Sequence, residues 1–160
     1  MRTFNEWLFV ENLKIMPINP EEDWDDAEKV DQIANMVGIR ISSNKNLVLI
    51  AMVNDEVVGG VYAAWEDDRE IDPNSKEPIK NWQYDVVVHP KWQGYKQVGI
   101  KLIQAAEKER KQMDAMYGTT TYTKLWVTNP KLARVLQSRR YNFQLDADHG
   151  EGGAHLSKYD

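Results

Sequence analysis

The chain of 160 residues contains no cysteine, which excludes disulfides, thiolate metal sites and cysteine nucleophiles. Its net charge of −5 argues against a general nucleic-acid binder, whose affinity depends on neutralising phosphates. Hydrophobic residues make up 42%, as in a typical globular protein, and no apolar run approaches the ~20 residues that span a bilayer. The first residues lack the apolar core of a signal peptide, so we expect a cytoplasmic protein that contacts neither membrane nor nucleic acid.

The first part of the chain predicts one strand and one helix. Residues 12–18 alternate weakly between apolar and polar side chains, which favours a short strand. A helix start follows, because Asn19 suits the N-cap, Pro20 the first helical position and Glu22 the acid of a capping box. Apolar residues then recur at helical spacing until Gly38, which predicts the end of the helix.

A hairpin is predicted next. Residues 46–53 (NLVLIAMV) are apolar almost throughout, and 56–65 (EVVGGVYAAW) follow after two turn residues. Both segments are therefore expected to be strands, joined by a turn at Asn54 and Asp55. Residues 66–81 are polar and contain two prolines, which predicts a loop.

The second half of the chain predicts strands alternating with helices. In chain order, the predicted strand, helix, strand, helix and strand are 82–88, 97–113, 120–128, 129–140 and 141–145. A glycine-rich turn (HGEGG) then returns the chain as AHLSKY. This order predicts a single α/β domain with a mixed central sheet, an antiparallel hairpin and flanking helices.

The turn between the strand 82–88 and the helix 97–113 has the features of an anion site. Gly94 and Gly99 can expose backbone amides at a helix start, where N–H groups are unpaired and carry a partial positive charge. Lys96 adds a full positive charge. Glycines between a strand and a helix also serve as plain turn residues, so these residues alone leave both interpretations open.

Three segments, in the right order, resemble the GCN5-related N-acetyltransferase (GNAT) superfamily. VVVHPKWQGYKQVGIKLIQAAE is similar to the family's central strand, glycine loop and helix, and LWVTNPKLARVLQSRRYNF resembles its later strand and helix. LVLIAMVNDEVVGGVYAAW resembles its second and third strands. Together they cover about residues 40–143. The resemblance implies a single GNAT-like, acyl-CoA-binding domain over residues 1–160.

The resemblance also implies acetyl-CoA as co-substrate. In the family the pantetheine arm pairs with the end of the central strand, which here places it on the backbone of Val86 and Val88. The pyrophosphate lies on amides of the glycine loop, and the later motif contributes Asn129. The loop residues expected to bind the cofactor are Gln93, Gly94, Tyr95, Lys96, Gln97, Val98 and Gly99.

The glycine loop departs from the family's pattern of Arg/Gln-x-x-Gly-x-Gly/Ala. An alignment on Gln93 places Lys96 and Val98 where the family has glycine and a small residue. An alignment on Gly99 places Gln97 at the first glycine. The loop therefore behaves as if it carried one residue too many, and a side chain at the first glycine would crowd the phosphates unless the loop changes shape.

Asp85 and Tyr141 are the candidates for acid–base catalysis. Asp85 would accept a proton from the amine if its surroundings raise its pKa; a solvated or salt-bridged strand aspartate is the alternative. Tyr141 or Tyr84 would donate a proton to the leaving thiolate, or each is a half-buried core tyrosine. Leu136 stands where many family members carry the tyrosine with this role.

The three histidines predict no metal site. His89 follows the valine run and is expected to be an exposed turn residue. His149 and His155 lie near the end of the chain and do not combine with other ligands at any zinc spacing.

Two functions of different class follow. The first is an N-acetyltransferase that transfers an acetyl group from acetyl-CoA to a primary amine of a small molecule or protein. The acidic segments 21–31 and 66–72 flank the side from which the family's substrates approach, which favours a cationic acceptor. The second is a catalytically inactive GNAT-like protein that binds a partner protein, with or without CoA. The oligomeric state stays open between monomer and homodimer.

Overall fold

The computed structural model describes residues 13–19, 21–74, 76–93, 97–127, 129–150 and 153–159, with the backbone alone at 67–70, 78 and 79. The strands are β1 (Leu13–Pro17), β2 (Asn46–Val53), β3 (Glu56–Ile71), β4 (Pro78–Val88), β5 (Tyr122–Val127), β6 (Gln144–Asp148) and β7 (Ala154–Lys158). The helices are α2 (Trp24–Met36), α3 (Val98–Tyr117) and α4 (Pro130–Leu136), with a 3₁₀ turn, η1 (Pro90–Trp92).

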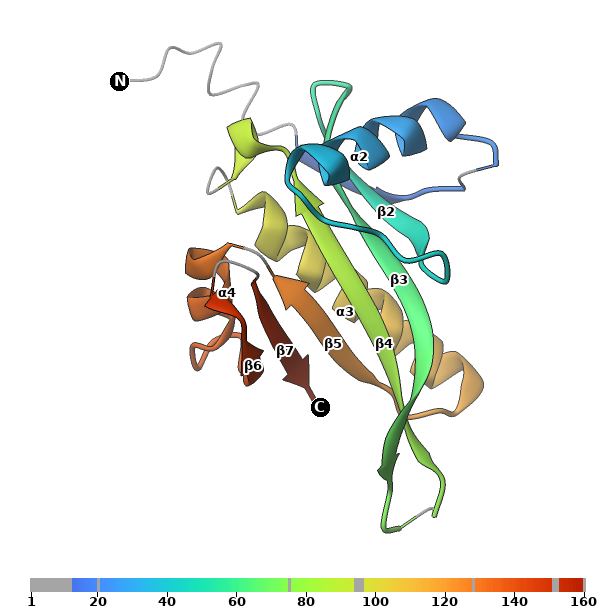
Figure 1. Ribbon diagram of the computed structural model, residues 1–160. Coiled ribbons are helices and arrows are strands. Elements are labelled where there is room, and N and C mark those ends of the chain that lie inside the picture. Colours follow the sequence, from blue (N-terminus) through green and yellow to red (C-terminus); the bar gives the residue numbers. More distant parts are fainter. Residues whose placement is uncertain are drawn as a thin grey trace. The chain divides into compact units, whose positions relative to one another are not determined.

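The strands form a seven-stranded mixed sheet in the order β1-β2-β3-β4-β5-β7-β6. Strand β4 runs parallel to β5, whereas β1 with β2, β5 with β7, and β6 with β7 are antiparallel pairs. The predicted α/β class with a mixed sheet and flanking helices is confirmed (Figure 1). Among the helices described, none is long and apolar enough to cross a membrane.

Contacts divide the chain into two compact units. The first comprises the residues up to Tyr62 together with Val86–Ala105, and the second comprises Ala63–Asp85 with Ala106–Asp160. The long elements β3, β4 and α3 therefore pass through both units.

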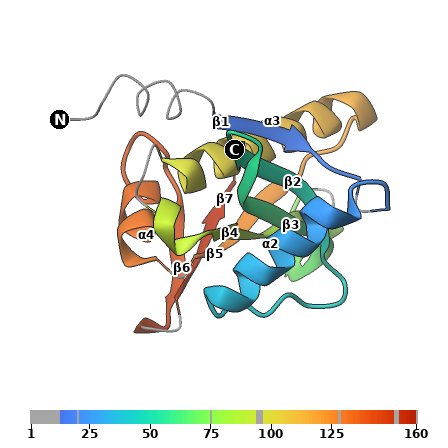
Figure 2. The same ribbon diagram turned by 90° about the horizontal axis from the view of Figure 1, so that it is seen from above.

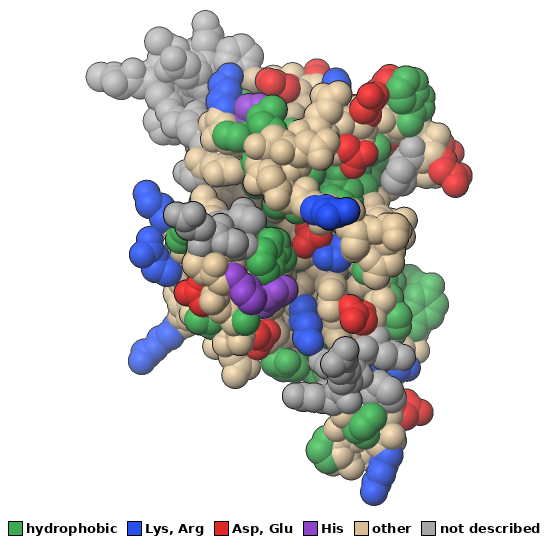
Figure 3. Space-filling model, viewed as in Figure 1, with side chains coloured by type: hydrophobic (Ala, Val, Ile, Leu, Met, Phe, Trp, Pro, Cys, Tyr) green, Lys and Arg blue, Asp and Glu red, His purple; other side chains and the backbone are tan. Residues whose placement is uncertain are grey.

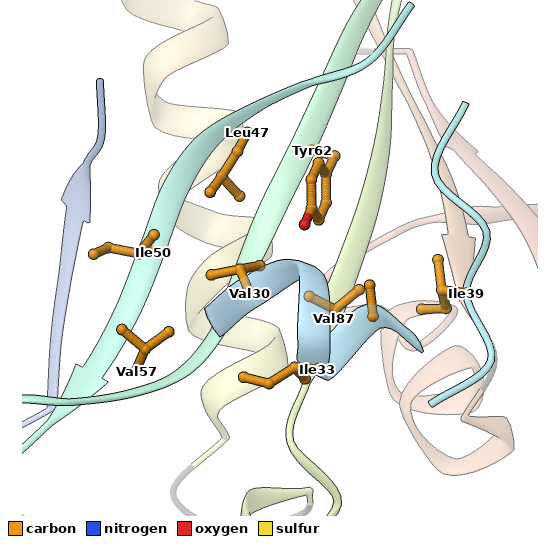
Figure 4. Close-up of a cluster of buried hydrophobic side chains, with 9 residues drawn as sticks. Val30, Ile33, Ile39, Leu47, Ile50, Val57, Tyr62 and Val87 are labelled. Carbon is orange, nitrogen blue, oxygen red and sulfur yellow. The ribbon is translucent and has the colours of Figure 1, made fainter. Parts of the chain in front are cut away.

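The core of the first unit lies between α2 and the strands β2, β3 and β4. Figure 2 shows α2 lying across β2 and β3, and Figure 4 shows side chains of these elements pointing toward one another. The buried members of this cluster are Val30, Ile33, Ala34, Ile39, Leu47, Ile50, Val57, Tyr62 and Val87. Tyr62 also donates a hydrogen bond from its hydroxyl to Asp31 on α2, which fixes the helix to the sheet.

Two adjacent glycines of β3 allow helices to approach both faces of the sheet in this unit. A Cβ at Gly60 would lie 2.9 Å from the Val30 side chain of α2. A Cβ at Gly59 would lie 2.4 Å from the Val87 carbonyl oxygen and 3.4 Å from the Leu102 side chain of α3. Since successive strand residues face opposite sides, α2 and the first half of α3 cover opposite faces of β3.

A largely buried ion cluster joins α3 to Thr121, just before β5, and to β7 in the second unit. Arg110, 2% exposed, donates from Nη1 to the carbonyl oxygen of Thr121 at 2.6 Å and lies 3.5 Å from a carboxylate oxygen of Glu107 and of Asp114. Lys158 of β7 lies 3.8 Å from Glu107. Opposite charges on both sides of Arg110 compensate for its removal from water.

The predicted helix start at Asn19 is wrong, because α2 begins at Trp24 and its N-cap residue is Asp23. Asn19 instead closes the turn before the helix: its carbonyl accepts from the Asp23 amide at 2.8 Å, and its side chain accepts from the Glu21 amide at 3.1 Å. Pro20 lies outside the described residues. The Asn19 side chain therefore stabilises a turn and not the start of the helix. An Asn or Asp side chain can accept from backbone amides in either place, so the sequence pattern did not distinguish the two. Gly38 follows the end of α2 with φ 76°, as expected of a residue after a helix.

The predicted loop at 66–81 is also wrong, because β3 extends to Ile71 and β4 begins at Pro78. Figure 1 shows these extensions as a two-stranded ribbon. Its tip is closed by backbone bonds in which the Asp72 amide donates to Glu77 at 2.9 Å and the Lys76 amide to Asp72 at 2.9 Å. Pairing between strands satisfies the hydrogen bonds of backbone N–H and C=O groups whatever side chains the residues carry. A segment of polar residues is therefore not necessarily a loop.

The β2–β3 turn is as predicted. Asn54 and Asp55 have φ values of 52° and 66°, and positive φ at both central residues is typical of the type I′ turn that suits a hairpin.

Candidate functional site

The end of β4 directs part of its backbone away from β3. The His89 amide donates to the Val58 carbonyl of β3 at 2.8 Å, and backbone groups of successive strand residues alternate in direction. The Val88 carbonyl therefore points away from β3, where it accepts from Gln93 Nε2 at 3.1 Å. The parallel pairing of β4 with β5 ends at Asp85–Trp126, although β4 continues to Val88. Gln93 and Val88, both predicted to bind cofactor, thus contact each other.

The start of α3 offers backbone amides. The Lys101 amide donates to the Gln97 carbonyl at 2.9 Å, so the amides of Val98, Gly99 and Ile100 precede this first intrahelical bond. No acidic residue stands in the first turn of α3 to neutralise its partial positive charge. Val98 as a whole residue is 1% exposed, and its side chain packs in the core. The other predicted loop residues, Gly94, Tyr95 and Lys96, lie outside the described residues.

Gln97 adopts a backbone conformation that favours glycine. Its φ is 55°, in the left-handed region that residues with a Cβ seldom occupy. The alignment on Gly99 places Gln97 at the family's first glycine, and the conformation agrees with that alignment. The backbone at Gln97 therefore has the conformation that favours glycine, although the residue carries a side chain.

Asp85 is buried in the second unit and has an interaction with other groups of the chain. It is 4% exposed and pairs in register with Trp126 on β5. Trp126 in turn pairs with His155 on β7, so Asp85, Trp126 and His155 form a row across three neighbouring strands. Side chains of residues paired in register point to the same face of a sheet.

Three aromatic rings gather at Trp126, and sequence reasoning did not find them. The His155 ring lies 4.4 Å from the Trp126 ring, the His149 ring lies 5.7 Å from Trp126, and the two imidazoles lie 5.2 Å apart, measured between ring centroids. Both histidines are exposed, and Figure 3 shows histidine side chains at the surface of the viewed face. The pairing of β5 with β7 brings these rings together, and the sequence signals it only through the glycine-rich turn.

The turn between β6 and β7 holds the ring cluster in place. The His149 amide donates to the Gly153 carbonyl at 2.9 Å, and the Gly150 amide donates to Asp148 Oδ1 at 2.9 Å. Gly153 has φ 101°, and a Cβ there would lie 3.1 Å from the Trp126 ring. The turn therefore packs against Trp126 and fixes where His149 lies.

Two residues from the later motif have structural partners. Asn129 is the N-cap of α4, since its side-chain oxygen accepts from the amides of Lys131 at 2.9 Å and Leu132 at 3.2 Å. Leu136, at the position of the family's tyrosine, is fully buried, so a tyrosine there would have to bury its hydroxyl.

The two candidate tyrosines are both buried. Tyr141 is 9% exposed, and the guanidinium of Arg140 lies over its ring at 5.4 Å. Tyr84 is 5% exposed, and burial raises its pKa although the positive charge of Arg110 acts in the opposite direction. Both tyrosines are therefore buried, which agrees with the alternative that each is a core residue and not a proton donor.

The described residues contain no group of three or more His, Cys, Asp or Glu side chains that could hold a metal ion. His89 is half-buried rather than exposed, and its Nδ1 accepts from the Lys91 amide at 3.1 Å, which caps η1.

Comparison with known proteins identifies the fold. No family model and no curated protein matches the chain. Among solved structures, an acetyltransferase of the GNAT family from Streptococcus pneumoniae matches with a TM-score of 0.56 and 15% identity, covering 91% of this chain and 98% of that one. The chain therefore has the fold of the GNAT acetyltransferases, as its motifs predicted.

Two further solved structures show the same fold with ligands. PaiA N-acetyltransferase from Thermoplasma acidophilum, in complex with coenzyme A, matches with a TM-score of 0.55 and 14% identity, covering 92% of this chain and 99% of that one. An aminoglycoside acetyltransferase from an uncultured soil metagenomic sample, in complex with sisomicin, matches with a TM-score of 0.54 and 17% identity, covering 88% and 92%. At these identities the likeness concerns the fold alone.

Proposed function

We propose that the chain is an N-acetyltransferase that transfers an acetyl group from acetyl-CoA to a primary amine of a small molecule or protein. The observation that carries this proposal is the start of α3, where three backbone amides precede the first intrahelical bond. Unpaired amides at a helix N-terminus bind phosphate, and coenzyme A carries a pyrophosphate. A solved structure with this fold holds coenzyme A.

In this proposal the whole chain acts as one acyl-CoA-binding domain. The pyrophosphate lies on the amides of residues 93–99, and the pantetheine arm lies on the backbone of Val86 and Val88. The direction of the Val88 carbonyl, away from β3, supports the second contact. Gln93 would have to release that carbonyl, or contact the arm itself, when the cofactor binds. Asn129 would contact the cofactor through its side-chain NH2 group, because its side-chain oxygen already caps α4.

The acceptor is proposed to be a cationic amine. The chain carries a net charge of −5, and α2 exposes Asp25, Glu28 and Asp31. Such a surface raises the local concentration of cations and speeds their encounter with the protein. One solved structure with this fold, an aminoglycoside acetyltransferase, holds sisomicin.

Calorimetric titration of the purified chain with acetyl-CoA, and then with CoA, tests the cofactor site. We expect saturable binding of both, weakened in Lys96→Glu by charge repulsion and in Gly99→Val by steric hindrance. Lys108→Glu, an exposed residue later in α3, makes the same charge change and is expected to bind like wild type. Wild-type affinity in both loop variants would exclude this loop as the phosphate site.

Acetyl transfer is measured with a thiol reagent, because the chain has no cysteine and the signal comes from released CoA alone. An aminoglycoside, a polyamine and a lysine peptide represent the acceptor classes. The alternative, an inactive partner-binding protein, is supported by the buried Leu136 at the family's tyrosine position. CoA binding without turnover on any of the three amines would favour that alternative.

A further inference from the structure

A basic patch lies on α4 and the turn after it, within the second unit of a chain whose net charge is −5. Residues 129–143 contain no acidic side chain, and their basic side chains are all exposed: Lys131, Arg134, Arg139 and Arg140. Figure 3 shows Lys and Arg side chains at the edge of the viewed face over α4. In the part of the chain that the structure describes, none of these side chains forms an ion pair with a carboxylate. The charges of the basic patch are therefore available to another molecule.

The fold holds the basic patch in a fixed arrangement. Lys131 and Arg134 are three residues apart on α4, so they project from the same face of the helix. The turn that carries the other two arginines is closed by a backbone bond in which the Phe143 amide donates to the Leu136 carbonyl at 2.8 Å. Val135, on α4 beside Arg134, is 40% exposed. Fixed cations around an exposed apolar side chain are typical of a protein-binding surface, where polar residues surround apolar ones and Arg is enriched.

The acidic surface of α2 has the complementary chemistry. Its exposed carboxylates belong to Glu21, Glu22, Asp25 and Glu28, and among the described residues none of them forms an ion pair. Asp25 and Glu28 have the same three-residue spacing as the two cations on α4. Trp24, four residues before Glu28 and on the same side of the helix, is 62% exposed. An Arg side chain pairs with a carboxylate through two hydrogen bonds and stacks on a Trp ring, so this surface offers both kinds of partner.

We infer that the basic patch binds the acidic surface of α2 on a second copy of this chain. Each surface lies within one unit, and the contact joins two different molecules. Because the patch of one copy meets a different surface of the next, the association is heterologous. A second copy fits the patch better than a nucleic acid does, since the net charge of −5 repels a chain of phosphates. The inference does not depend on the proposed acetyl transfer.

Sedimentation equilibrium of the purified chain, without acetyl-CoA or amine, tests the inference. We expect the average mass to rise with protein concentration up to about 1 mM at low salt, and to fall again in high salt because ions screen the contact. The patch variant, Lys131→Glu with Arg134→Glu, should associate at least about 10-fold more weakly. Lys108→Glu with Lys111→Glu makes the same charge change at the same spacing on exposed positions of α3, and should associate like wild type.

A mixture of two variants separates a lost contact from a lost fold. Asp25→Lys with Glu28→Lys, the α2 variant, should associate as weakly as the patch variant, because each variant alone brings like charges together. An equimolar mixture of the two variants brings opposite charges together again and should recover association. Lys131→Gln with Arg134→Gln removes the charges without repulsion, so its loss should lie between wild type and the patch variant.

Wild type that stays monomeric at every concentration would overturn the inference, as would association of wild-type strength in both charge-reversal variants. A monomeric wild type that binds polyglutamate or single-stranded RNA, with the binding lost in the patch variant, would also overturn it and assign the basic patch to that partner. Asp25 and Glu28 belong as well to the surface proposed to attract the acceptor amine, which is why association is measured without substrate. Failure of association would therefore leave the proposed acetyl transfer standing.

Discussion

At the scale of single residues, backbone conformation explains the unusual glycine loop. Gln97 has φ 55° directly before α3, and left-handed backbone costs a residue with a Cβ about 1–2 kcal/mol. This conformational strain lies in the loop where the phosphates of the cofactor are proposed to bind. Strain of this kind at a binding loop is typical of functional sites.

Gln97→Gly is therefore expected to stabilise the chain by about 1 kcal/mol in urea unfolding, since glycine adopts this φ without strain. The variant should also bind CoA more tightly, because the side chain at the family's first glycine is gone. Gln104→Gly is the control: Gln104 is exposed within α3, where glycine should destabilise by about 1 kcal/mol. A loss of stability in both variants would show that the loop is not strained at Gln97.

A second prediction at this scale concerns Gly59. Gly59→Ala places a Cβ 2.4 Å from the Val87 carbonyl oxygen, so β3 and β4 must separate. We expect a loss of about 1–3 kcal/mol in urea unfolding. Gly118→Ala, with φ 64° and no atom within 4 Å of the new Cβ, carries only backbone strain and should lose less. Equal losses would mean that the contact with Val87 relaxes at no cost.

At the scale of elements, one partly buried hydrogen bond attaches α2 to the sheet. Tyr62 of β3, a member of the apolar cluster of the first unit, donates to the exposed Asp31 of α2. Burial, and then the hydrogen bond and charge of Asp31, raise the pKa of Tyr62 above its ordinary value of 10.0. Attachment of α2 should therefore depend on the phenol keeping its proton.

Stability is expected to fall as the pH rises above 10.0, because the unfolded chain then loses the Tyr62 proton while the folded chain keeps it. The free energy of unfolding should fall by about 1.4 kcal/mol per pH unit for this residue. Tyr62→Phe should remove that part of the slope, measured by urea unfolding followed through tryptophan fluorescence. Tyr117→Phe, at an exposed position, is the control. A slope in Tyr62→Phe as steep as in wild type would contradict this assignment.

At the scale of the whole molecule, the charge balance favours cationic partners. The net charge of −5 attracts cations. Salt screens this attraction, so that at 0.1 M ionic strength it extends over about 10 Å, the Debye length. An acidic surface of this kind acts on the rate of encounter more than on the affinity of the bound state.

For a cationic acceptor, kcat/KM should therefore decrease as the salt concentration rises, whereas for an acceptor with a single amino group and a carboxylate it should change little. The measurement is thiol release at subsaturating acceptor in increasing sodium chloride. An identical salt dependence for both acceptors would argue against a cationic substrate.

Sequence alone was enough to predict the order of the elements and the strand, turn and helix around Gly99. Local patterns sufficed for this, because apolar periodicity, the turn at Asn54 and Asp55, and the glycines around Gly99 depend on neighbouring residues. They did not determine where elements end. The polar ribbon at 66–81 belongs to β3 and β4 because backbone pairing, not side-chain character, extends a strand.

Which side chains come together is visible only in the folded chain. His149 and His155 carried no ligand spacing in the sequence, yet the pairing of β5 with β7 places both rings against Trp126. In the same way the structure buried Asp85 and Tyr141, the two candidates for catalysis that the sequence offered. Burial and ring contacts depend on residues far apart in the chain, and a single sequence does not record which strands become neighbours.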